Sequence, residues 1–145
     1  MNKIAIGLLA GWALIQAGAA ELDWQTDLPK AQEQAKKENK LVMLDFTGSD
    51  WCGWCKKLNA EVFSKPEFAD YAKKNLVLVE VDFPRMKKLT EAQQKANNAL
   101  QEKYKIEGYP TIVVLDGDGK QVGTLNYMSS PKPFIEGLEK MKKKA

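Results

Sequence analysis

Residues 41–58, LVMLDFTGSDWCGWCKKL, place the two cysteines of the chain between an expected strand and an expected helix. The apolar run at residues 41–46, interrupted by Asp45, has the length and continuity of a strand that is covered on both faces. Residues 56–62 favour a helix directly after Cys52 and Cys55. The stretch therefore predicts a strand, a cysteine pair and a helix in direct succession.

The spacing of Cys52 and Cys55 suits reversible redox chemistry, because two cysteines separated by two residues close a small ring that can open again. Unpaired N–H groups and the positive end of the dipole at a helix N-terminus stabilise a thiolate, so Cys52 should have a lowered pKa and attack first. Cys55, one turn further in, should be more buried and resolve the mixed disulfide. Trp51 and Trp54 flank the first sulfur and offer apolar surface to an extended peptide.

Two other roles for the cysteine pair stay open. An inert structural disulfide would close a loop too short to constrain the unfolded chain much, because the entropic gain grows with loop length. Half of a metal site shared between two chains would need further ligands from a second chain. A preceding strand, a following helix and an export signal together favour the redox role.

Outward from this stretch, helices and strands alternate along the chain. We expect helices at residues 27–40, 64–71, 90–104 and 131–143, and strands at 76–82, 111–115 and 120–125. Strands connected through helices imply parallel pairs, whereas the turn at residues 116–119 makes the last two strands an antiparallel hairpin. The inner face of the helix at 90–104 should hold Ala92, Ala96, Leu100 and Tyr104. The predicted fold class is α/β, with a mixed central sheet, a C-terminal antiparallel hairpin and helices on both faces.

Composition excludes several functional classes. A length of 145 residues allows one domain, and the 22 basic against 19 acidic residues form no basic stripe, which argues against nucleic acid as a partner. The lysines at residues 140–144 are expected to be a solvated helix end. Histidine is absent, which excludes Ser-His-Asp and Cys-His catalysis and every metal site that contains histidine. We therefore expect no metal site and no cofactor.

Residues 1–20 have the layout of a secretory signal peptide. One early positive charge, Lys3, precedes an apolar stretch at residues 4–15, and small residues at 17–20 precede the polar Glu21. The stretch is shorter than the ~20 residues that a membrane-spanning helix needs. Cleavage is expected after Ala19 or Ala20, and the mature chain is expected to be periplasmic or secreted, where two cysteines can persist as a disulfide.

Leu44-Asp45-Phe46, the segment at residues 51–57 and Gly108-Tyr109-Pro110-Thr111 before a strand resemble motifs of the thioredoxin family. The likeness is to its secreted or periplasmic group, which includes the C-terminal domain of the bacterial inner-membrane thiol reductase. It implies a thioredoxin-like domain at residues 21–145 with Pro110 in the cis form, facing the dithiol. In that family the residue before the proline, here Tyr109, presents backbone groups that pair with the bound substrate strand. We expect Trp51, Gly53, Trp54 and Pro110 to contact that strand as well.

The resemblance further implies a role for Asp45, which is similar to the buried aspartate that assists proton transfer to the inner cysteine in thioredoxin. One extra residue lies between Asp45 and Trp51, and Glu80 stands in the strand where a lysine often accompanies that aspartate. A role in loop hydrogen bonding stays open for Asp45. The basic loop at residues 83–90 is longer than its equivalent in thioredoxin, and we interpret it as solvated rather than as shaping partner choice.

The sequence thus predicts a thiol-disulfide oxidoreductase that acts on thiols and disulfides of exported proteins. It is expected to be monomeric and to be recharged by a membrane or periplasmic thiol reductase. Gly53-Trp54 between the cysteines and the absence of histidine favour a reductant or isomerase-like shuttle over a strong oxidant. The alternatives are a redox-silent module that binds peptides or a subunit in the groove at Pro110, and a metal carrier.

Overall fold

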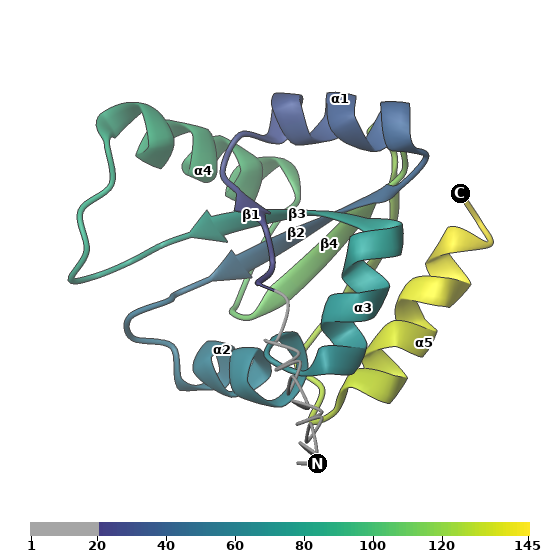
Figure 1. Cartoon of the computed structure of the whole chain (residues 1–145). Coiled ribbons are helices and arrows are strands. Elements are labelled where there is room, and N and C mark those ends of the chain that lie inside the picture. The colour runs from purple at the N-terminus through teal and green to yellow at the C-terminus, as the bar shows by residue number, and fades with distance from the viewer. Residues whose placement is uncertain (1–20) are drawn as a thin grey trace, which may run out of the picture.

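The computed structural model describes residues 21–145, and its centre is a five-stranded mixed sheet in the order β1-β3-β2-β4-β5 (Figure 1). The strands are β1 (Trp24–Gln25), β2 (Leu41–Thr47), β3 (Leu76–Asp82), β4 (Thr111–Leu115) and β5 (Gln121–Leu125). The helices are α1 (Leu28–Glu38), α2 (Gly53–Leu58) with the π-helix η1 (Asn59–Phe63) continuing it, α3 (Pro66–Asn75), α4 (Glu91–Lys103) and α5 (Pro131–Lys142). The predicted fold class is confirmed, whereas the expected signal peptide at residues 1–20 lies outside the described residues.

Helices cover both faces of the sheet, with α1 and α4 on one face and α2, α3 and α5 on the other (Figure 1). Consecutive residues of a strand point to opposite faces, so β2 supplies both cores. Val42, Leu44 and Phe46 pack in the core beneath α1. Leu41 and Met43 pack in the other core, against the phenylalanines of η1, α3 and α5. This explains the unbroken apolar run, and the alternation directs Asp45 to the face that carries α2.

The observed strands differ from the predicted ones in two respects. The short strand β1 was not predicted, and it pairs in parallel with β3 through Trp24↔Leu78. The pair β2–β3 is parallel as expected, but β4 is antiparallel to β2. The expectation that helix-connected strands are parallel was wrong for β4. The connection through α4 returns the chain to the end of the sheet where β3 ends, since Asp82 of β3 and Thr111 of β4 pair with adjacent residues of β2.

Side-chain amides at four-residue spacing connect α4 to neighbouring segments of the chain. Gln93 donates to the carbonyl of Thr26 at 3.2 Å, and Asn97 donates to the carbonyl of Asp82 at 2.9 Å. Gln101 donates to the hydroxyl of Tyr109 at 2.7 Å. These polar bonds add to apolar packing, because Leu100 of α4 and Tyr104 directly after it pack against the core that contains Phe46.

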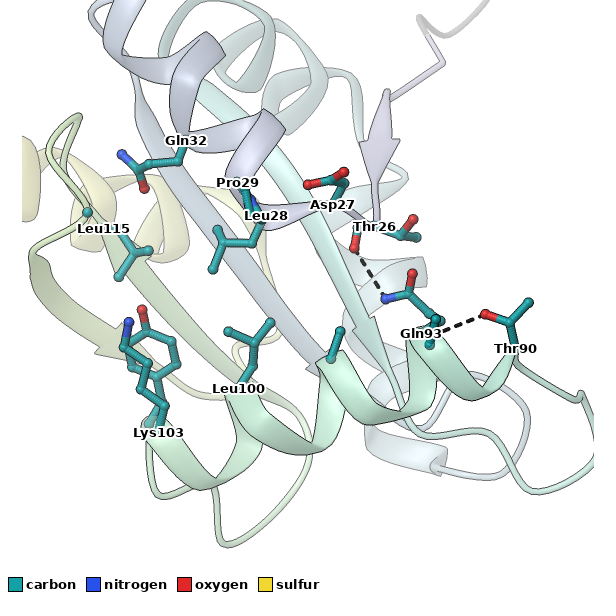
Figure 2. Close-up of a pocket in the computed structure, with 14 residues that line it drawn as sticks. Thr26, Asp27, Leu28, Pro29, Gln32, Thr90, Gln93, Leu100, Lys103 and Leu115 are labelled. Atoms are coloured by element: carbon teal, nitrogen blue, oxygen red, sulfur yellow. Dashed lines mark hydrogen bonds between the residues drawn. The ribbon is translucent and has the colours of Figure 1, made fainter.

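The expected inner face of α4 was therefore wrong in its first half. Asn97 is buried, whereas Ala92 and Ala96 are exposed and line a groove of about 580 Å³ between α1 and α4. Figure 2 shows Leu28 of α1 and Leu100 of α4 on opposite walls of this groove. None of the residues that line it belongs to the loop that carries the cysteines.

Candidate active site

The two cysteines lie where the loop after β2 enters α2. Cys52 is the N-cap of α2, and its Sγ accepts a hydrogen bond from the backbone N–H of Cys55 at 3.2 Å. The two sulfurs form a disulfide, with the Cα atoms 5.2 Å apart. A sulfur at this position receives an N–H group that the helix leaves unpaired, which favours its thiolate once the disulfide is reduced.

Burial does not separate the two cysteines as the sequence analysis expected. Each residue is 6% exposed, so the expectation that Cys55 is the more buried one was wrong. What separates them is the hydrogen bond, because Cys52 accepts an N–H at the helix end and Cys55 lies within the first turn.

Trp51 and Trp54 have different surroundings. The Trp51 indole donates to the carbonyl of Phe83 at 2.8 Å, and its ring is perpendicular to that of Tyr109, with the centroids 5.8 Å apart. A Cβ at Gly48 would overlap the indole, so only glycine permits this packing. Trp54 is 57% exposed, and its ring lies 4.9 Å from that of Tyr127, between centroids, with the two planes tilted by 59°. Of the two rings, Trp54 offers the free apolar surface.

Asp50 ties the loop at residues 83–90 to the cysteine segment. Its carboxylate accepts hydrogen bonds from the backbone N–H groups of Arg85 at 2.9 Å, Met86 at 2.8 Å and Lys87 at 2.9 Å. These bonds, the one from Arg85 first, lower the pKa of Asp50 to about 2. Residues 85–88 are exposed, as the interpretation of a solvated loop expects, but their backbone is tied to the cysteine segment. Sequence reasoning missed Asp50 because bonds to backbone groups leave no residue signature in the loop that donates them.

A second aspartate anchors the same segment from β3. Asp82 is buried and accepts from the N–H of Ser49 at 2.9 Å and from its hydroxyl at 2.5 Å. Lys87 completes the cluster with an ion pair to Asp82 at 3.2 Å. The loop before the cysteines is thus held on one side by β3 and on the other by the segment that follows β3.

Tyr109 and Pro110 lie beside the cysteine loop and the segment that follows β3. The Tyr109–Pro110 peptide bond is cis, and Pro110 is buried. Contacts of the Tyr109 ring with Trp51 and with Phe83, the latter at 5.4 Å, bring the proline segment next to the cysteine loop. A groove of about 510 Å³ adjoins the proline and continues towards Thr124 of β5.

Asp45 is buried on β2, opposite Glu80 of β3 and Ile112 of β4. Burial, followed by the negative charges of Glu80 and Asp82, raises the pKa of Asp45 to about 8. Its Oδ1 atom is buried and has no hydrogen-bond partner among residues 21–145. A role of this oxygen in loop hydrogen bonding therefore has no bond to support it, whereas a carboxyl that titrates near neutrality suits proton transfer.

Residues 21–145 contain no cluster of three or more histidine, cysteine, aspartate or glutamate side chains that could hold a metal ion. Within the same residues, every helix is too short or too polar to cross a bilayer.

Comparison with known proteins agrees with this geometry. The family described as thioredoxin-like domain matches residues 28–142. The disulfide bond reductase DsbH of Chlamydia pneumoniae is 38% identical over 109 residues, which are 75% of this chain and 65% of that protein. The thiol:disulfide interchange protein DsbD of Pasteurella multocida is 28% identical over 113 residues, which are 77% of this chain and 18% of that protein. A solved DsbH oxidoreductase structure superposes with a TM-score of 0.81 at 33% identity, covering 92% of this chain and 95% of that one. The chain thus spans under two thirds of the length of these curated relatives.

Proposed function

The chain belongs to the thioredoxin-like domain family, and from that premise we propose that it is a thiol-disulfide oxidoreductase that reduces disulfides of exported proteins through Cys52 and Cys55. The observation that carries the proposal is the hydrogen bond from the Cys55 N–H to the Cys52 sulfur at the N-cap of α2. This bond would stabilise a Cys52 thiolate as the attacking group.

The reaction follows as two exchanges. The Cys52 thiolate attacks one sulfur of the substrate disulfide, and the other substrate sulfur leaves as a thiolate, giving a mixed disulfide. The Cys55 thiolate then attacks Cys52 Sγ and releases the second substrate sulfur. The substrate gains two electrons and two protons, and the protein loses them to form the Cys52–Cys55 disulfide seen in the structure.

Asp45 and the proline segment have separate parts in this proposal. Asp45 accepts the proton of Cys55, to which its pKa of about 8 is suited. An extended substrate segment lies across Gly53 and Trp54 and adds as a strand to the backbone at Tyr109 and Pro110.

Export and recharging complete the proposal. We propose that residues 1–20 are a signal peptide, so that the mature monomer works in the periplasm or outside the cell. DsbH is named a reductase and DsbD an interchange protein, and these names support a reducing role and recharging by a membrane or periplasmic thiol reductase.

Insulin reduction tests the proposed activity against a redox-silent binding module. We expect the wild type to reduce insulin with dithiothreitol as electron source, and the Cys52→Ser and Cys55→Ser variants to fall to the rate of dithiothreitol alone. Serine keeps the size of the side chain but cannot form a disulfide. Equal rates in the wild type and both variants would contradict the enzyme and favour the binding module.

A further inference from the structure

Arg85 lies over Trp51, directly beside the attacking cysteine. Its guanidinium carbon is 3.8 Å from the centre of the Trp51 ring, a stacked cation–aromatic contact. The backbone bond from Arg85 to Asp50 and the indole bond to Phe83 fix both partners of this stack. The backbone of Arg85 and the Trp51 ring are thus held by the fold, and the contact with that ring places the guanidinium beside the cysteine loop.

The guanidinium has no acidic partner within the described residues. The side chain is exposed, and between residues 21 and 145 no carboxylate lies within 4.0 Å of it. The nearby carboxylates have other partners, because Asp50 accepts three backbone N–H groups and Asp82 pairs with Lys87. A guanidinium that lies over a ring keeps its N–H donors in its own plane, pointing outward. There they can bind the two oxygens of a carboxylate.

The other side of the cysteine pair carries a second, weaker stack. Lys57 Nζ lies 5.2 Å from the centre of the Trp54 ring and 5.8 Å from that of Tyr127. Glu61 lies 4.0 Å from the same ammonium and also bonds the Tyr127 hydroxyl. Glu61 thus partly compensates the charge of Lys57. Of the two cations, Arg85 is the one without an acidic partner among the described residues.

We propose that Arg85 selects substrates whose cysteine is flanked by acidic residues, with a carboxylate of the substrate pairing with the guanidinium above Trp51. This inference rests on the proposed oxidoreductase function and names its substrate class. Arg85 is a specificity-determining residue and takes no part in the exchange itself. Because the pair is exposed, salt should weaken it.

Two blocked peptides test the proposal, each used as a disulfide-linked dimer and differing only in having glutamates or glutamines on both sides of the cysteine. The rate at which each oxidises the reduced protein is followed by tryptophan fluorescence at low salt. We expect the wild type to react about fivefold faster with the glutamate peptide, a ratio that falls towards one in high salt. We expect Arg85→Met to bring the ratio to about one. Lys140→Met, an exposed lysine of α5 whose loss changes the net charge equally, should leave the ratio unchanged.

A ratio of one in the wild type, or a preference retained by Arg85→Met, would overturn the inference. A second measurement separates it from the proposed function. Cysteine-free versions of both peptides are titrated onto the Cys52→Ser/Cys55→Ser double variant, followed by fluorescence anisotropy. Tighter binding of the acidic peptide, lost on adding Arg85→Met, would support the inference even if the wild type reduced neither dimer, and that second result would contradict only the proposed function. Equal binding of both peptides would overturn the inference.

Discussion

The Cys55→Ala variant is expected to accumulate as a mixed disulfide with its substrate, whereas Cys52→Ala forms none and loses disulfide reduction by at least about a thousandfold. The asymmetry follows from the N-cap position of Cys52, whose sulfur receives the Cys55 N–H. Without Cys55, the first exchange proceeds and no internal thiol remains to release the substrate. Without Cys52, the thiol favoured for attack is missing.

Mass spectrometry under non-reducing conditions measures both outcomes after each reduced variant is mixed with a peptide disulfide. The Cys52→Ala/Cys55→Ala double variant serves as the control for non-specific adducts. An adduct on Cys55 in the Cys52→Ala variant, as abundant as that on Cys52 in its counterpart, would show that the assignment of the two roles is wrong.

Asp45→Asn is expected to stabilise the oxidised protein by several kcal/mol at pH 9 and to change its stability little at pH 4. Burial raises the pKa of Asp45 from about 3.8 to about 8, so the folded state holds a proton that the unfolded state releases between these values. The free energy of unfolding of the wild type should therefore fall with rising pH through this window, by up to ~1.4 kcal/mol per pH unit from this group. Asparagine does not ionise and removes this contribution.

Urea unfolding at pH 4, 6 and 9 checks this prediction, with Asp50→Asn as the matched control. The pKa of Asp50 is lowered to about 2 by backbone N–H groups, so its charged form stabilises the folded state above the ordinary pKa and loses that effect in acid. Asp50→Asn should consequently destabilise the protein at pH 6 and 9, the opposite sign. An Asp45→Asn variant with the same pH slope as the wild type would contradict the account of this buried carboxyl.

The sequence predicted the elements whose patterns are long and local. The apolar runs of β2 and β3 and the turn before β5 are such patterns, and the structure confirms them. Strand β1 has two residues and depends on pairing with β3, so it carries no periodicity of its own. The direction of β4 depends on the path of the chain through α4, which returns to the end of the sheet where β3 ends, and no local pattern encodes that path.

The residues of the candidate site also fall into those that local motifs predict and those that only the fold brings together. Cys52, Cys55, Asp45 and Pro110 belong to local motifs and could be named from the sequence. Arg85 lies over the ring of Trp51, which belongs to a loop far earlier in the sequence, and no spacing rule describes such a contact. Its position became predictable only once the fold had placed the two loops side by side.

The midpoint potential of the Cys52–Cys55 couple, measured by equilibration against glutathione, tests the central claim of a reducing dithiol most directly. No histidine is present to stabilise a thiolate strongly, so we expect a potential below about −200 mV, towards the ~−270 mV of thioredoxin. A potential near −120 mV, typical of a strong oxidant, would contradict the reducing role.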